Sequence, residues 1–141
     1  MVQSPCIGVK YARDSLKRSE EEAKTEFEDK LWQEYRSIVS NLPVGVMLGD
    51  DNEKEEVNSH LKWFFAYFDL TNSQIYLRIQ ERVRPETWTE WCDGIRDHFG
   101  KPSFKIAWDQ IRPKAISHGT LKELRRLEKE GFIGDPKEWS D

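Results

Sequence analysis

The histidines and cysteines are the residues of this chain most able to hold a metal or act in catalysis, and they are dispersed. His60, His98 and His118 lie far apart, and Cys92 is distant from Cys6, the only other cysteine. Zinc sites usually show paired ligands at short spacing. The chain also holds no nucleophile-elbow, phosphate-loop, dinucleotide-binding or zinc-protease motif. We therefore predict no metal, no cofactor and no catalytic residue, and the sequence favours a non-enzymatic protein.

The acidic stretch from Asp50 to Glu56 has the composition of a calcium loop without its spacing. An EF-hand loop carries glycine at position 6 and a bidentate glutamate at position 12. Counted from Asp50, these two positions hold Glu55 and Leu61. The stretch instead fits a helix start, where acidic side chains complement the macrodipole.

Two polar residues on an apolar segment form the best candidate for a polar pocket. Asn72 lies on the apolar seam, and Asp69, about one helical turn earlier, can neighbour it. A buried polar group without partners costs about 1–3 kcal/mol. One interpretation is a small-ligand pocket that also involves Tyr76 and Trp91. The other, which we favour, is a hydrogen-bonded core network that fixes the register of the helix.

Charge is distributed unevenly along the chain. Residues 14–56 hold 13 acidic side chains against six basic ones, whereas residues 101–130 hold eight basic side chains against four acidic ones. The simpler interpretation is two solvated faces, or acidic and basic helices that face each other. The alternative is a basic patch that binds an anionic membrane, nucleic acid or an acidic protein. Its candidate residues are Lys122, Arg125, Arg126 and Lys129.

Hydrophobic periodicity predicts that the scaffold for these residues is helical. One seam of mostly apolar residues repeats at spacings of 4-3-4-3-4, and a second such seam runs beside it. The first seam consists of Leu61, Phe65, Phe68, Asn72, Ile75 and Ile79. We expect one long helix from Asn52 to about Arg82. A helix that is apolar around much of its circumference is usually the central one of a bundle.

Four further segments carry helix signals. They run from Ser15 to Asn41, from Pro85 to a left-handed Gly100, from Pro102 to the residue before Pro113, and from a Thr120–Glu123 capping box to Gly131. The apolar segment Leu42–Leu48 is expected to be a connector. Residues 1–14 show no sustained period and predict a loose tail ahead of a single domain at 15–141. We therefore predict an all-α fold, a compact bundle of four to five helices around the aromatic-rich helix.

Composition narrows the partners and the compartment. The net charge of −4 and the pI of about 5.5 argue against nucleic acid as the main partner. Two distant cysteines and the lack of a signal-peptide pattern predict a cytoplasmic protein. The longest apolar stretch, Leu61 to Leu77, is interrupted by charged and polar residues, whereas a membrane helix needs about 20 predominantly apolar ones. We expect no integral membrane segment here.

Spaced aromatic blocks carry a resemblance to a known kind of protein. In order, they are Tyr67–Leu70, Gln74, Trp88 with Trp91, Gly94-Ile95, Ala107-Trp108, and an ending from Arg125 to Trp139. Together they resemble uncharacterised bacterial helical proteins in which an apolar helix precedes a Trp-bearing helix and a helix with an Ala-Trp pair. The resemblance covers roughly Lys30 to Trp139. It implies a soluble bacterial all-α protein and brings no activity or site residue with it.

Three functions are compatible with these observations. The leading hypothesis is a non-enzymatic interaction or regulatory module that binds a protein partner or a second copy of itself. It is motivated by the wide apolar face and the uneven charge. The alternative is a small-ligand sensor or enzyme with a pocket near Asp69, Asn72, Tyr76 and Trp91. The third is binding of an anionic membrane or nucleic acid by the basic C-terminal region.

Overall fold

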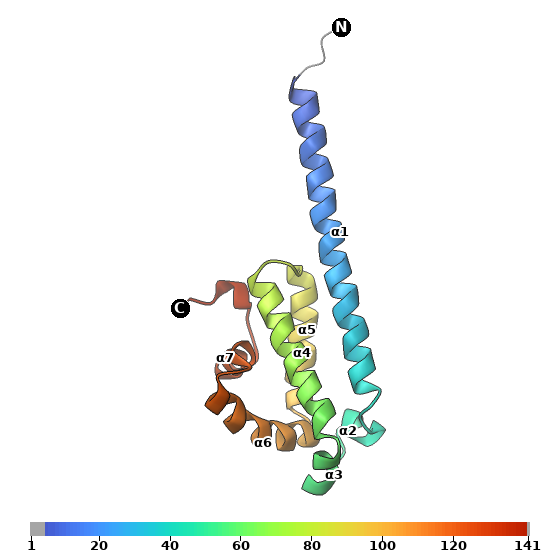
Figure 1. Cartoon of the computed structure of the whole chain (residues 1–141), viewed down its shortest axis with the longest axis vertical. Helices are drawn as coiled ribbons and strands as arrows, with labels where there is room; N and C mark the ends of the chain where they lie inside the picture. The colour runs from blue at the N-terminus through green and yellow to red at the C-terminus, as the bar shows by residue number, and fades with distance from the viewer. Residues whose placement is uncertain (1–4, 141) are drawn as a thin grey trace.

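The computed structural model describes residues 5–140 and contains only helices within them, which confirms the all-α prediction. Seven α-helices replace the expected four to five, and a short 3-10 turn, η1, follows them. Their bounds are α1 Pro5–Val39, α2 Val44–Leu48, α3 Lys54–Ser59, α4 Leu61–Ile79, α5 Pro85–Phe99, α6 Pro102–His118, α7 Lys122–Lys129 and η1 Pro136–Glu138. The body they form is compact around a buried aromatic cluster, and α1 runs along it and beyond it (Figure 1).

Helix α4 is the centre of the fold, as its apolar circumference predicts. It packs against α1, α3, α5, α6, α7 and η1. Phe64, Phe68 and Ile75 are fully buried on it. Phe64 meets Phe104 edge-to-face with ring centroids 5.1 Å apart, and Phe68 meets Trp108 at 5.0 Å. Such edge-to-face pairs add stability beyond the apolar area that they bury.

The expected long helix from Asn52 to Arg82 is divided at His60. That residue leaves the helical region (φ −117°, ψ 16°) and separates α3 from α4. With this bend, α3 packs against α6, and Val57 on α3 is fully buried. This tertiary packing divides a segment whose apolar residues repeat with the period of one continuous helix. Asn52, the expected start of that helix, lies before α3, and its amide donates to Ser103 Oγ at 2.9 Å.

Two other boundaries and the conformation of one helix end differ from the expectation. The connector at residues 44–48 folds into α2, which buries Val46. Helix α6 continues through Pro113 to His118 because Ala115, beyond the proline, is still buried in the core. Gly100 has φ −79° and is right-handed rather than left-handed, with its N–H donating to the carbonyl groups of Arg96 and Asp97.

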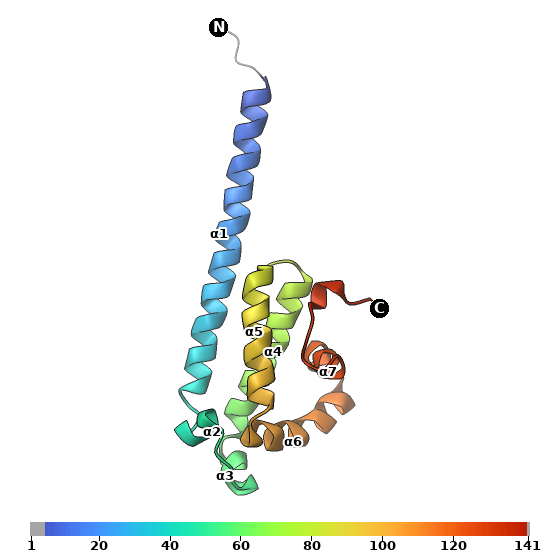
Figure 2. The ribbon, with the colours of Figure 1, turned by 180° about the vertical axis from the view of Figure 1, so that it is seen from behind.

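Helix α1 begins at Pro5, although a loose tail is expected up to Asp14. Residues 1–4 of that tail lie outside the described residues. A 35-residue helix is about 52 Å long, and its first half projects beyond the body in both views (Figures 1 and 2). Every side chain from Gly8 to Ala23 is exposed. Extending an existing helix costs little compared with nucleating one, so the docked half can propagate the free half.

The docked half of α1 is fixed to the turn between α4 and α5 by Arg84. The guanidinium donates to Glu28 Oε1 at 3.1 Å, to the Glu21 carbonyl at 3.0 Å and to Thr25 Oγ1 at 2.8 Å. Thr87 also donates to Glu28 Oε1, at 2.7 Å. These contacts hold one wall of the cavity described below.

The C-terminal segment is fastened to α4 by a buried ion pair. Arg78 is 5% exposed and forms a bidentate pair with Asp135, at 2.9 Å from Nε and 2.7 Å from Nη2. Its Nη1 donates to the Val83 carbonyl at 2.9 Å. The planar guanidinium thereby satisfies a carboxylate and a chain turn at once.

Candidate functional site

A cavity of about 180 Å³ lies where α1 meets α4 and α5. Two of its lining residues come from α1, two from α4 and five from α5, so the cavity exists only while α1 is docked. They are Trp32 and Tyr35, Tyr67 and Gln74, and Glu90, Trp91, Gly94, Ile95 and His98. We call it the α1/α5 cavity.

Helical spacing places these side chains toward one another. Trp32 and Tyr35 are three residues apart on α1, and their rings stack with centroids 5.5 Å apart. Trp91, Ile95 and His98 follow at spacings of four and three on one face of α5. Trp32 is half exposed, whereas His98 is buried at 7% exposure, so the cavity runs from an open aromatic rim to a closed end.

At the closed end, the hydrogen bonds of His98 fix its tautomer. Lys101 Nζ lies 3.1 Å from His98 Nδ1, and an ammonium group can only donate, so Nδ1 accepts. The neutral ring then carries its hydrogen on Nε2, which lies 2.8 Å from the Tyr35 hydroxyl and donates to its oxygen. The hydroxyl hydrogen of Tyr35 is therefore free to donate to a guest.

Electrostatics keeps this end of the cavity uncharged at neutral pH. Burial, reinforced by the positive charge of Lys101, lowers the pKa of His98 to about 4. Burial raises the pKa of both the Tyr35 and the Tyr67 hydroxyl groups. Both tyrosines and the histidine are therefore neutral hydrogen-bonding groups rather than an acid–base pair near pH 7.

Gln74 supplies the most informative polar group of the wall. Its side chain is 7% exposed and lines the cavity, and no hydrogen bond to its amide occurs within the described residues. Thr71 Oγ1 is the one fully buried polar side-chain atom without a partner in the part of the chain that the structure describes, so the Gln74 amide is not sealed from solvent. An amide with both a donor and an acceptor therefore faces the cavity without a protein partner.

The structure separates the four residues that sequence reasoning grouped as a pocket or core network. Trp91 lines the α1/α5 cavity. Asp69 is exposed and lines a different hollow beside Glu34, and Tyr76 is 48% exposed. Sequence reasoning did not identify Trp32 and Tyr35 as site residues; the seven-residue spacing of Trp91 and His98, which puts both on one face of a helix, is the local signal that could have paired those two.

Asn72 is half-buried and caps another helix. Its Oδ1 accepts from the backbone N–H of Leu124 at 2.9 Å, and its Nδ2 donates to Glu123 Oε2 at 3.0 Å. Leu124 is the third residue of α7, where a capping side chain normally binds. The expected Thr120 cap does not form, and Leu121 takes the N-cap position with a φ of 53°.

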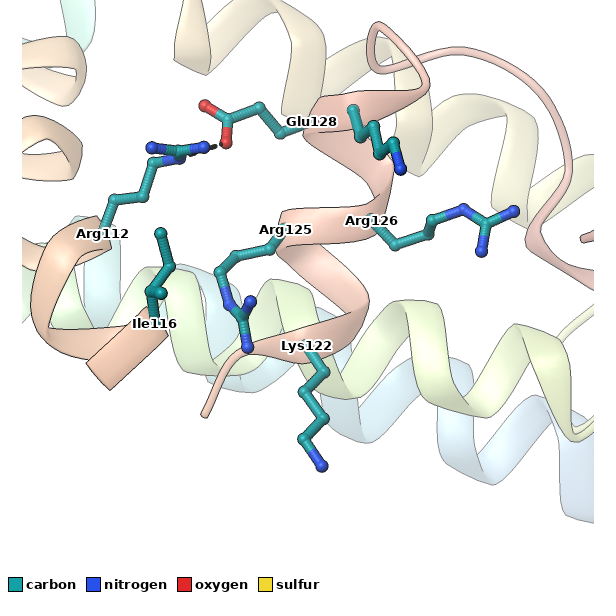
Figure 3. A pocket seen from close by; sticks show the side chains of 7 residues that line it. Arg112, Ile116, Lys122, Arg125, Arg126 and Glu128 are labelled. Carbon is teal, nitrogen blue, oxygen red and sulfur yellow. Dashed lines mark hydrogen bonds and ion pairs between the residues drawn. The ribbon is translucent and has the colours of Figure 1, made fainter. Parts of the chain in front are cut away.

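The candidate basic residues line a separate open hollow of about 440 Å³ on α6 and α7 (Figure 3). Arg112 binds Glu128 at 2.6 Å, and Glu128 also accepts from the Trp108 indole. Arg126 pairs with Glu130 at 2.8 Å. Lys122, Arg125 and Lys129 also line this hollow. The four residues predicted as a basic patch are therefore brought together.

Other chemistry has little support within residues 5–140. No group of three or more metal-ligating side chains converges there, and no described helix is long and apolar enough to cross a membrane. Cys92 is buried, its thiol donates to the Phe132 carbonyl at 3.3 Å, and burial raises its pKa. It is therefore a thiol rather than a reactive thiolate at neutral pH.

Comparisons with known proteins identify no family for this chain. No protein-family profile matches the chain, and searches of the curated proteins and of the solved structures find no match. Within residues 5–140 the protein is all-helical.

Proposed function

We propose that this protein is a non-enzymatic binder of a small ligand, which it holds in the α1/α5 cavity. The observation that carries the proposal is the unpaired Gln74 amide on the wall of that cavity. The free hydroxyl hydrogen of Tyr35 faces the same partly apolar space. A mostly apolar cavity with a few convergent polar groups is the usual form of a small-molecule site.

The size and position of the cavity limit what it does. Its volume of about 180 Å³ is below the roughly 300–1,000 Å³ of pockets for drug-sized ligands. The guest is therefore small. Because α1 contributes Trp32 and Tyr35, a bound guest touches both α1 and the body. Binding should then stabilise the docked position of α1. It would thereby link the ligand to the exposed part of α1 at residues 8–23, which we call the projecting arm.

A screen of small polar and aromatic fragments by thermal unfolding and indole fluorescence tests this proposal. We expect hits that stabilise the wild type, by about 2.7 kcal/mol at a hundredfold excess over Kd. Gln74→Leu should weaken them by tenfold or more, because it removes both the donor and the acceptor. Gln33→Leu, on the exposed surface of α1, is the matched control. Hits that bind Gln74→Leu as tightly as wild type would contradict the proposal.

The projecting arm of α1 favours a second candidate, self-association. Four basic side chains, Lys10, Arg13, Lys17 and Arg18, precede the main acidic cluster of α1, Glu20 to Asp29, which also holds Lys24. An antiparallel pair of arms, centred between Ser19 and Glu20, places these four bases opposite Asp29, Glu26, Glu22 and Glu21 of the second copy. Opposite charges in register favour such pairing.

Light scattering on a size-exclusion column, at low and at high salt, tests whether two copies of the protein associate through the projecting arm. We expect a dimer at low salt that weakens as salt screens the pairs. Lys17→Glu should dissociate it, and the double variant Lys17→Glu with Glu22→Lys should restore it. A monomer under all conditions, or a double variant no better than the single one, would refute arm pairing.

The spaced aromatics support membership of a bacterial helical family, and the cysteine usage supports a cytoplasmic location. The hollow on α6 and α7 supports binding of an anionic partner, which would be steeply salt-dependent.

A further inference from the structure

We infer that the α1/α5 cavity selects a small organic cation, such as a quaternary or alkylated ammonium group. The inference rests on the proposed ligand-binding function and adds the chemical class of the ligand. Three features of the cavity carry it, namely its aromatic walls, its one carboxylate and the neutral groups at its closed end.

Four aromatic residues wall the cavity: Trp32, Tyr35, Tyr67 and Trp91. The Trp32 and Tyr35 rings lie 5.5 Å apart between centroids, and the Tyr35 and Tyr67 rings lie 6.3 Å apart with planes inclined by 59°. The Tyr35 and Tyr67 ring planes therefore differ in direction, and both rings line the cavity. The face of an aromatic ring attracts a cation within about 6 Å, and cages of several rings are used to bind quaternary ammonium groups.

The charges around the cavity have the sign that a cation needs. Glu90, which is exposed, is the one charged side chain among the lining residues at neutral pH, because His98 is neutral and the lining holds no lysine or arginine. Lys101 approaches His98 on its Nδ1 edge, away from the Nε2–Tyr35 contact, and is paired with Asp97 at 3.3 Å. An anionic guest would face the Glu90 carboxylate without a compensating cation.

The neutral polar groups then set the orientation of the guest. A quaternary ammonium group has no N–H to donate to the Gln74 amide, so a second functional group on the ligand should form the hydrogen bond there. A hydroxyl or carbonyl a few atoms from the cationic centre can accept from the Tyr35 hydroxyl or bind the Gln74 amide. The preferred guest therefore carries both a cationic head and a short polar tail.

Choline and its neutral isostere 3,3-dimethylbutan-1-ol form the matched probe pair, measured by calorimetric titration of the full chain. They share shape and hydroxyl group and differ in charge. We expect choline to bind at least about tenfold more tightly than the alcohol, as a partly desolvated cation–π site implies. Glu90→Gln should reduce choline affinity several-fold and leave the alcohol unchanged. Glu86→Gln, one turn earlier on α5 and outside the cavity, should change neither.

The outcomes separate this inference from the proposed function. If the alcohol binds as tightly as choline, or if only neutral fragments bind in a Gln74-dependent way, the cation assignment is refuted while the ligand-binding function stands. If no probe or fragment binds, both are refuted. Selective choline binding that Glu90→Gln leaves intact would also overturn the inference, because the carboxylate would then play no part.

Discussion

The buried His98 should make folding stability fall on mild acidification. In the folded protein its pKa is lowered to about 4 from an ordinary 6.5, chiefly by burial. Protonation would also place a second cation beside Lys101, whose Nζ is 3.1 Å from Nδ1. The unfolded chain therefore binds the proton more readily than the folded one does between pH 6.5 and 4.

The sign and size of the effect follow from linkage. The unfolded state binds more protons in that interval. The contribution of neutral His98 to the free energy of unfolding is therefore fully present above pH 6.5 and is lost as the pH falls toward 4. At about 1.4 kcal/mol per pH unit, the full loss is about 3 kcal/mol. Between pH 7 and pH 5 alone, the same two pKa values give a loss of about 2 kcal/mol. Carboxylates such as Asp135, whose pKa is lowered by Arg78, contribute at lower pH.

Urea unfolding of the wild type and of His98→Gln at pH 7, 6 and 5 measures this loss. A glutamine amide can still donate to the Tyr35 oxygen, and it does not titrate. We expect the wild type to lose about 2 kcal/mol relative to His98→Gln over this range. Parallel curves for the two proteins would show that His98 titrates normally, and the buried neutral tautomer would be refuted.

Three other perturbations test the scaffold. Asn72→Ala should lower the free energy of unfolding by about 1–2 kcal/mol because it removes the cap of α7. Thr120→Ala should leave that free energy nearly unchanged. If Thr120→Ala cost more than Asn72→Ala, Thr120 and not Asn72 would be the cap of α7. Asp135→Ala should cost about 3 kcal/mol, since it leaves Arg78 buried and unpaired, and a loss under 1 kcal/mol would argue against that ion pair. Arg84→Gln should speed hydrogen exchange in residues 21–30 while α7 is unchanged, and unchanged exchange in α1 would show that other contacts dock it.

Local pattern was sufficient to predict much of the scaffold. The apolar circumference of residues 61–79 identified the central helix because burial there requires it. Pro85 and Pro102 marked true helix starts, since a missing N–H is tolerated in the first turn. The break at His60 was not predictable from the pattern, because it depends on the packing of α3 against α6, which follows much later in the chain.

The candidate site was harder to predict because its parts are distant in sequence. The spacing of Trp32 and Tyr35 fits a helix face that packs against the body as well as it fits the wall of a cavity. Nothing in the local sequence shows that Gln74 and His98 lie opposite them. Asn72 was noticed as a polar residue on an apolar seam, yet its partners on α7 lie about fifty residues away. The basic residues were found readily, because one short amphipathic helix carries all four.

The most direct test of the central claim is a two-dimensional NMR titration of the six indole N–H groups with choline. Trp32 and Trp91 line the cavity, whereas the indoles of Trp88 and Trp108 are hydrogen-bonded to Gly134 and Glu128 elsewhere. We expect the Trp32 and Trp91 signals to shift in a saturable way while those of Trp88 and Trp108 stay in place. No shift at Trp32 and Trp91, or shifts led by the other indoles, would contradict binding in the α1/α5 cavity.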